Sequence, residues 1–158
     1  MPHNRLIPFF CCILFLGGTQ IGAAQTTFKI SSQAPERSIW GKALIKIAQN
    51  VSAVTDGEVA FKIFHGGVQG DEQTVLRKMR VKQLHGAAFI GQGLSIINPD
   101  SLVLTLPALF ESQEEFEYVL NEVGPEIAQG CAKRGYQILS YPQLGYAFAF
   151  SRDPIHSL

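Results

Sequence analysis

The chain contains few of the residues that cross-link small exported domains. Of its three cysteines, Cys11 and Cys12 lie in an N-terminal apolar segment, so only Cys131 remains for the rest of the chain. A single cysteine cannot form an internal disulfide, and no histidine follows it at the spacing of a nucleophilic motif. We therefore expect Cys131 to be a small buried apolar residue on a helix, and the fold to be held by its hydrophobic core.

The chain also lacks an excess of charge of either sign. It has 13 lysines and arginines and 13 aspartates and glutamates, and no basic stripe is visible along it. Surfaces that bind nucleic acid or anionic membranes need clustered positive charge. We therefore expect no nucleic-acid partner.

Catalytic and cofactor motifs are missing as well. His65 and His85 have no third ligand at metal-binding spacing, and Gly93-Leu-Ser-Ile96 lacks the closing glycine of a nucleophile elbow. Gly66-Gly-Val-Gln-Gly70 precedes a helix, but a phosphate-binding loop needs Lys followed by Ser or Thr. Here Asp71-Glu72 would repel an anion instead. We interpret the segment as a strand-to-helix turn capped by Asp71, and predict no catalytic group, metal or cofactor.

Residues 1–24 have the pattern of an export signal. Arg5 supplies a positive charge, Leu6 to Leu16 form an apolar run, and Gly22-Ala-Ala24 is a small-residue cleavage site. The run is shorter than the roughly 20 residues that span a bilayer. We predict an exported, periplasmic protein that begins near Gln25; the alternative is an uncleaved membrane anchor.

The next part of the chain alternates strand and helix patterns. Residues 28–31 alternate as a short strand, residues 39–54 carry apolar side chains at helical spacing, and residues 58–64 alternate again. A helix follows Asp71, and residues 86–90 form a small-residue strand. This strand–helix–strand order predicts a parallel sheet with right-handed crossovers.

Further elements are expected toward the C-terminus. The apolar run 102–106 is typical of a strand buried on both faces, and Ser112-Gln-Glu-Glu115 is a capping box that begins a helix. Gly124-Pro125 is expected to break and restart that helix. Residues 136–141 and 146–151 are predicted as two more strands. The elements up to residue 140 are enough for one α/β lobe.

Ligands of α/β proteins usually bind at the carboxyl ends of the strands. Aromatic residues lie at several of these ends, and most of them are expected to be core. Phe89 and Tyr146 each lie where a predicted strand meets a glycine-bearing turn. We therefore assign these two to a binding site.

Six motifs in a specific order carry a family resemblance. They resemble the periplasmic solute receptors of tripartite ATP-independent periplasmic (TRAP) transporters, of the dicarboxylate-receptor-like type. The motifs are Ala34-Pro-Glu-Arg-Ser-Ile-Trp-Gly41, Thr55-Asp-Gly-Glu-Val59, Gly66-Gly-Val-Gln-Gly-Asp71, Ala87-Ala-Phe89, Leu106-Pro-Ala-Leu-Phe110 and Ser151-Arg-Asp-Pro-Ile155.

The resemblance implies a periplasmic-binding-protein-like, type II-like α/β fold that captures a small organic solute, either an organic acid or a more apolar ligand. Residues 25–140 would form the first lobe, and residues 141–158 a crossover strand toward a second lobe. The receptor would deliver its solute to membrane permease subunits. The implied ligand-binding residues are Gln33, Ala34, Trp40, Phe89, Gln92, Gly93, Pro107, Phe110, Tyr146 and Ala147.

Two departures from the family pattern bear on the solute. Many acid-binding members have an arginine where this chain has Ala147, and a second arginine strand would follow beyond Leu158. We therefore expect a truncated receptor that binds weakly, from a parent that prefers a more apolar or differently anchored solute. The alternatives are a small exported α/β hydrolase or transferase using Ser95 or His85, and a non-binding adaptor or relic.

Overall fold

The computed structural model describes residues 25–107, 109–142 and 152. The predicted signal segment, the predicted strand 146–151, and the site residues Tyr146 and Ala147 lie outside the described residues. Within the described part of the chain, no helix combines the length and apolar character needed to cross a membrane.

A three-stranded sheet forms the first part of the fold. Its strands are β1 (Thr26–Ser32), β2 (Val59–Phe64) and β3 (Gly86–Ala88), in the order β2-β1-β3. Both neighbours of β1 run parallel to it, with Ser31 opposite Phe64 and Ser32 opposite Ala88. The predicted parallel sheet is confirmed, although β3 ends two residues earlier than expected.

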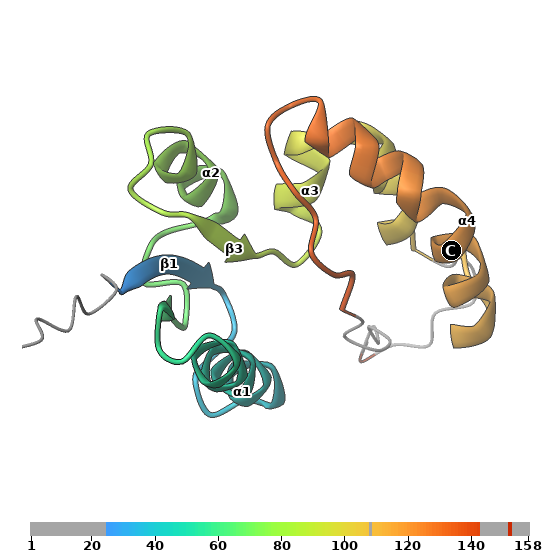
Figure 1. Cartoon of the computed structure of the whole chain (residues 1–158). Helices are drawn as coiled ribbons and strands as arrows, with labels where there is room; N and C mark the ends of the chain where they lie inside the picture. Colours follow the sequence, from blue (N-terminus) through green and yellow to red (C-terminus); the bar gives the residue numbers. More distant parts are fainter. Residues whose placement is uncertain (1–24, 108, 143–151, 153–158) are drawn as a thin grey trace, which may run out of the picture.

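Two capped helices cover the sheet. Helix α1 (Ile39–Val54) begins at Ser38, whose hydroxyl accepts the Gly41 N–H at 3.1 Å. Helix α2 (Glu72–Arg80) begins at Asp71, whose carboxylate accepts the Thr74 N–H at 2.7 Å. The predicted capped turn before α2 is therefore confirmed. Figure 1 shows α1 and α2 on opposite sides of the sheet, as expected when successive right-handed crossovers run in opposite directions.

The remaining helices pack against the α2 side. They are α3 (Gln92–Ile97), a 3₁₀ helix η1 (Pro99–Thr105) and α4 (Gln113–Ala132). Their shared core contains Leu76 of α2, Ile97, Ile127 and Cys131. The Cys131 side chain is fully buried and burial raises the pKa of its thiol, so the apolar role predicted for it is confirmed.

Two predictions for this helical part are wrong. Residues 102–106 are not a strand but lie mostly in η1, and Leu102 and Leu106 are about half exposed rather than buried. The hydroxyl of Ser101 donates to the Asn98 carbonyl at 2.8 Å, which favours the tight turn. Helix α4 is not broken at Gly124-Pro125. Pro125 is exposed, so its missing N–H is lost on a solvent-facing side of a 20-residue helix.

The predicted strand 136–141 is also wrong, because these residues pair with no strand among those described. The side chains of this segment nevertheless divide into packed and exposed ones. Tyr136, Ile138 and Tyr141 pack against the shared core, whereas Leu139 is 90% exposed. The Tyr141 hydroxyl donates to the Gly124 carbonyl at 3.1 Å, so this segment is held by side chains rather than by a ladder. The described residues thus form one α/β lobe.

Candidate functional site

Three loops begin side by side at the carboxyl end of the sheet. β1 leads into Gln33, β2 into His65 and β3 into Phe89. Ser32 lies opposite Ala88, so the next residues along the two segments, Gln33 after β1 and Phe89 after β3, are also neighbours. In Figure 1 the arrowheads of β1 and β3 point the same way, toward α3. The structure therefore brings together the predicted site residues that follow β1 and β3.

The loops after β1 and β2 are fastened to each other. The Gln33 side-chain amide donates to the Gly70 carbonyl at 2.8 Å, and the Gly66 N–H donates to the Ala34 carbonyl at 2.9 Å. Gly67 has a φ of +70°, and a Cβ there would lie 2.5 Å from the Gln33 side-chain oxygen. Gln33 and Ala34 are therefore part of a fixed wall, and the Gln33 amide already has a partner within it.

The loop after β3 carries Phe89, Gln92 and Gly93. Gly91 has a φ of +119° and is the N-cap of α3. A Cβ on Gly93 would lie 2.5 to 2.8 Å from atoms of the Phe89 ring, so the ring lies directly against this glycine. Phe89 is half-buried and packs on the shared core, whereas Gln92 is exposed. The loop therefore presents one aromatic edge and one free amide.

A buried carboxylate that the sequence analysis did not assign to the site holds this loop. Glu72 is 7% exposed, and its two oxygens accept the N–H groups of Ile90 and Gly93, the latter at 2.5 Å. Asp71 already caps α2, so the helix does not need a second acid for this purpose. The acid at the next position was therefore the one signal in the sequence that Glu72 has another role.

Pro107, Phe110 and Trp40, the other predicted site residues that the structure describes, have fewer contacts with the loops after β1 and β3. The end of η1 approaches the loop, since a Cβ on Gly91 would lie 3.0 Å from the Thr105 methyl group. Pro107 is exposed two residues later, and the Phe110 ring lies edge-on to Phe116 at 5.1 Å. Trp40 is half-buried at the second position of α1, and none of the described contacts joins it to these loops.

The electrostatic character of the edge is mild. Across residues 33–37, 65–71 and 89–93, all of them described, Arg37 is the one lysine or arginine, and it is exposed. Two buried polar atoms at this end, Ser31 Oγ and His65 Nδ1, have no hydrogen-bond partner among the described residues. The Lys78 ammonium contacts the 65–71 loop, where it donates to the carbonyl and side-chain oxygens of Gln69. Such an edge can offer hydrogen bonds and an aromatic surface to a solute.

The groups considered for catalysis have other roles. His85 Nδ1 accepts the Lys29 N–H at 2.8 Å, and its ring lies edge-on to Phe28 at 5.7 Å. The Ser95 hydroxyl donates to the Gln92 carbonyl at 2.8 Å. In the described ranges, no three His, Cys, Asp or Glu side chains gather where they could hold a metal ion. His85 and Ser95 therefore each have a structural partner, and the hydroxyl and the imidazole are not paired with each other for reaction.

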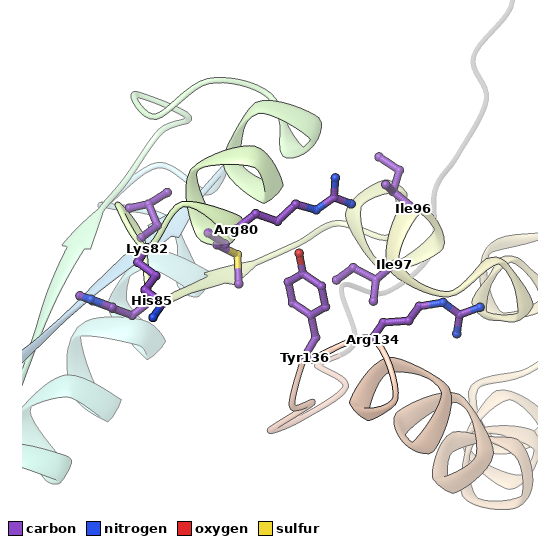
Figure 2. Close-up of a pocket in the computed structure, with 10 residues that line it drawn as sticks. Arg80, Lys82, His85, Ile96, Ile97, Arg134 and Tyr136 are labelled. Atoms are coloured by element: carbon purple, nitrogen blue, oxygen red, sulfur yellow. The ribbon is translucent and has the colours of Figure 1, made fainter.

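A separate cavity of about 580 Å³ lies at the other end of β3. Figure 2 shows Arg80 at the end of α2, Arg134 beyond α4, and Tyr136 and Ile97 between them. His85, which directly precedes β3, also lines it. The cavity is therefore at the amino end of the sheet, away from the loops described above, and none of the predicted site residues lines it.

Comparison with known proteins agrees with this architecture. Residues 30–158 match the family model described as bacterial extracellular solute-binding protein, family 7. A solute-binding protein of Chromohalobacter salexigens is 30% identical over 114 residues, which cover 72% of this chain and 34% of that protein. A second solute-binding protein, from Roseobacter denitrificans, is 26% identical and is covered to 42%. The chain thus spans about a third to two fifths of the length of the curated relatives it matches.

Solved structures show the same fold. A TRAP periplasmic solute-binding protein from Chromohalobacter salexigens, with bound D-glucuronate, superposes with a TM-score of 0.65 at 29% identity. The match covers 72% of this chain and 38% of that one. Another, from Roseobacter denitrificans with bound L-galactonate, has a TM-score of 0.64 at 25% identity, with 70% and 37% covered.

The family resemblance noted from the six motifs is confirmed by these matches. The enzymatic alternative is wrong, because the family and its relatives are solute-binding proteins rather than hydrolases or transferases. The chain belongs to family 7 of the bacterial extracellular solute-binding proteins, the family of TRAP solute receptors.

Proposed function

We propose that this chain forms one wall of a periplasmic receptor that captures a small organic acid and delivers it to TRAP permease subunits. The observation that carries the proposal is the register of β1 and β3, which sets the Gln33 and Phe89 loops side by side at the carboxyl edge. This is the edge at which α/β proteins bind small molecules. Both loops are built from fixed backbone rather than from reactive side chains.

A hydroxylated organic acid is the solute class that we favour. The two superposed relatives hold D-glucuronate and L-galactonate, which combine one carboxylate with several hydroxyl groups. Here the half-buried ring of Phe89 provides an apolar surface for C–H groups, and the exposed Gln92 amide can pair with hydroxyl groups. A solute of this kind uses both features at once.

The carboxylate would be held weakly by this chain alone. A charge-assisted hydrogen bond contributes about 1.5–3 kcal/mol, against roughly 8 kcal/mol for micromolar affinity. Arg37 is the one guanidinium among the residues of the three loops, and the position that carries arginine in many acid-binding members is Ala147. In a longer receptor, a second lobe would close over the solute and favour the closed state by its additional contacts. We expect a millimolar or weaker dissociation constant for the 158 residues.

A nuclear magnetic resonance titration of the full chain tests the proposal. We expect D-glucuronate at tens of millimolar to shift the amide signals of Ala34, Phe89 and Gln92, and D-glucose to shift them less. Gln92→Ala should weaken this response several-fold. The matched control is Gln83→Ala, because Gln83 is also exposed but precedes β3 at the opposite end.

Three outcomes would contradict parts of this proposal. Shifts confined to Arg80 and Arg134 would move the solute site to the cavity in Figure 2. The absence of any shift would favour the adaptor alternative. A micromolar dissociation constant measured by calorimetry would refute the expectation that one lobe binds weakly.

A further inference from the structure

Glu72 connects the start of α2 to the loop that follows β3. It is the first residue of α2, yet its carboxylate is directed away from its own helix, to N–H groups 18 and 21 residues further along the chain. The first-turn acids of α4 show how unusual this is. Glu114 and Glu115, in the first turn of α4, are both exposed.

The carboxylate replaces a cap that α3 does not have. Gly91 is the N-cap of α3 and has no side chain with which to accept an N–H. The first N–H groups of a helix have no partner inside it, and negative charge is favourable there. Glu72 supplies both the acceptor and the charge, with one oxygen on Ile90 and the other on Gly93.

These two bonds bracket the part of the loop that carries the predicted site. Gly91 lies between them at a φ of +119°, a conformation that few other residues adopt. Gly93, held by Glu72, lies against the Phe89 ring, so the same contact determines where that ring rests. Gln92, between the two bonded residues, is left exposed.

We propose that Glu72 is a positioning residue that fixes the Phe89–Gly93 loop, and that the N-terminus of α3 is therefore closed to the solute's carboxylate. The N–H groups of Ile90 and Gly93 are already bonded to the protein's own carboxylate. A second anion brought to them would meet a buried negative charge. The solute can then use the Phe89 ring and the Gln92 side chain, and its carboxylate must be anchored elsewhere. The link to solute binding rests on the proposed function; the link to the loop does not.

Amide hydrogen exchange of the full chain without any solute tests the positioning role. Glu72→Gln keeps the shape of the side chain, but its NH₂ group cannot accept an N–H. We expect exchange at Ile90 or Gly93 to become about 10- to 100-fold faster, since a charge-assisted hydrogen bond is lost. Exchange at Gly67 and His85, whose N–H groups donate to the Ser32 and Lys29 carbonyls of β1, should change less than two-fold.

The matched control is Glu114→Gln, which removes a carboxylate from a helix start without removing a described hydrogen bond. It should leave the exchange of Ile90 and Gly93 unchanged. Equal acceleration at all four amides in Glu72→Gln would show only a loss of stability and would overturn the proposal, as would no change at Ile90 and Gly93. If Glu72→Gln does not fold, scalar couplings across the hydrogen bonds decide the question in the unmodified chain. Coupling from the Glu72 carboxylate carbon to the Ile90 and Gly93 nitrogens supports the proposal, and its absence overturns it.

A titration with D-glucuronate then tests the link to binding. Glu72→Gln should reduce the response of Phe89 and Gln92 several-fold relative to the unmodified chain, because the loop is less fixed. If the unmodified chain shows no response, the proposed function fails while the exchange result still stands. If the unmodified chain responds and Glu72→Gln responds equally, Glu72 does not position the loop for the solute.

Discussion

The two parts of this lobe are held together in different ways. The sheet layer, made of β1, β2, β3 and α1, relies on backbone ladders and leaves much apolar surface exposed; Ile39 and Val54 of α1 are 86% and 81% exposed. The helical layer, made of α3, η1 and α4, buries Ile97, Ile127 and Cys131 almost completely. Helix α2 joins the two, through Leu76 in the core and Glu72 at the loop. Backbone hydrogen bonds therefore hold the sheet layer together, whereas side-chain packing holds the helical layer together.

The largest expected effect is at the junction of the layers. Leu76 is 1% exposed in the shared core, so Leu76→Ala should lower the free energy of unfolding by about 2–5 kcal/mol. Leu139→Ala makes the same chemical change at a side chain that is 90% exposed, and should alter stability by less than about 0.5 kcal/mol. Urea unfolding followed by circular dichroism measures both. Equal effects would mean that α2 does not join the layers through this core.

A smaller effect is expected when a methyl group is added to each layer, and its cost in stability should differ between the two layers. A Cβ at Gly41 in α1 would collide with the backbone carbonyls of Pro35 and Glu36, whereas one at Gly130 in α4 would meet the end of the Asn98 side chain. Backbone cannot move aside easily, so Gly41→Ala should cost about 1–3 kcal/mol.

Gly130→Ala should cost about 1 kcal/mol or less, because Asn98 can rotate and alanine favours helix. Thermal unfolding of the two variants in parallel gives the comparison. A larger loss in Gly130→Ala would show that the Asn98 side chain, which donates to the Ile127 carbonyl at 3.3 Å, is as rigid as backbone.

The smallest effect concerns pH at the start of α2. Hydrogen bonds from the Thr74 hydroxyl and N–H, with the positive charge of Arg77, hold the pKa of Asp71 below its ordinary value. A carboxyl whose pKa is lowered by folding stabilises the fold above its unfolded pKa of about 4, and this contribution is lost as the pH falls through the folded value. The free energy of unfolding of the unmodified chain and of Asp71→Asn should be measured between pH 2 and 7. The difference between the two values should become smaller below about pH 4. A difference that does not change with pH would contradict this.

The same division explains which elements could be predicted from the sequence. In the sheet layer and at the start of α2, local patterns decide the structure: the alternation before Phe64, the helical spacing up to Val54 and the cap at Asp71 all predicted the observed elements. In the helical layer, the apolar run 102–106 fits a buried strand or a buried helical turn equally well. Which one forms depends on the partner that covers it, and the sequence does not show that partner.

For the candidate site, the parallel direction of the strands could be predicted and side-chain contacts could not. The parallel sheet implied that the Gln33 and Phe89 loops share an edge, and the register confirms this. The pairing of Glu72 with Ile90 and Gly93 depends on how α2 leans on α3, which no local pattern encodes. Whether Trp40, Pro107 and Phe110 line the same site stays a prediction.

The most direct test of the account is a crystal structure of the chain grown with a high concentration of D-glucuronate. We expect the sugar acid at the carboxyl edge of the sheet, with its ring against Phe89 and its carboxylate away from the start of α3. Density for the sugar acid at the amino end of the sheet, beside Arg80 and Arg134, with the carboxyl edge empty, would contradict it.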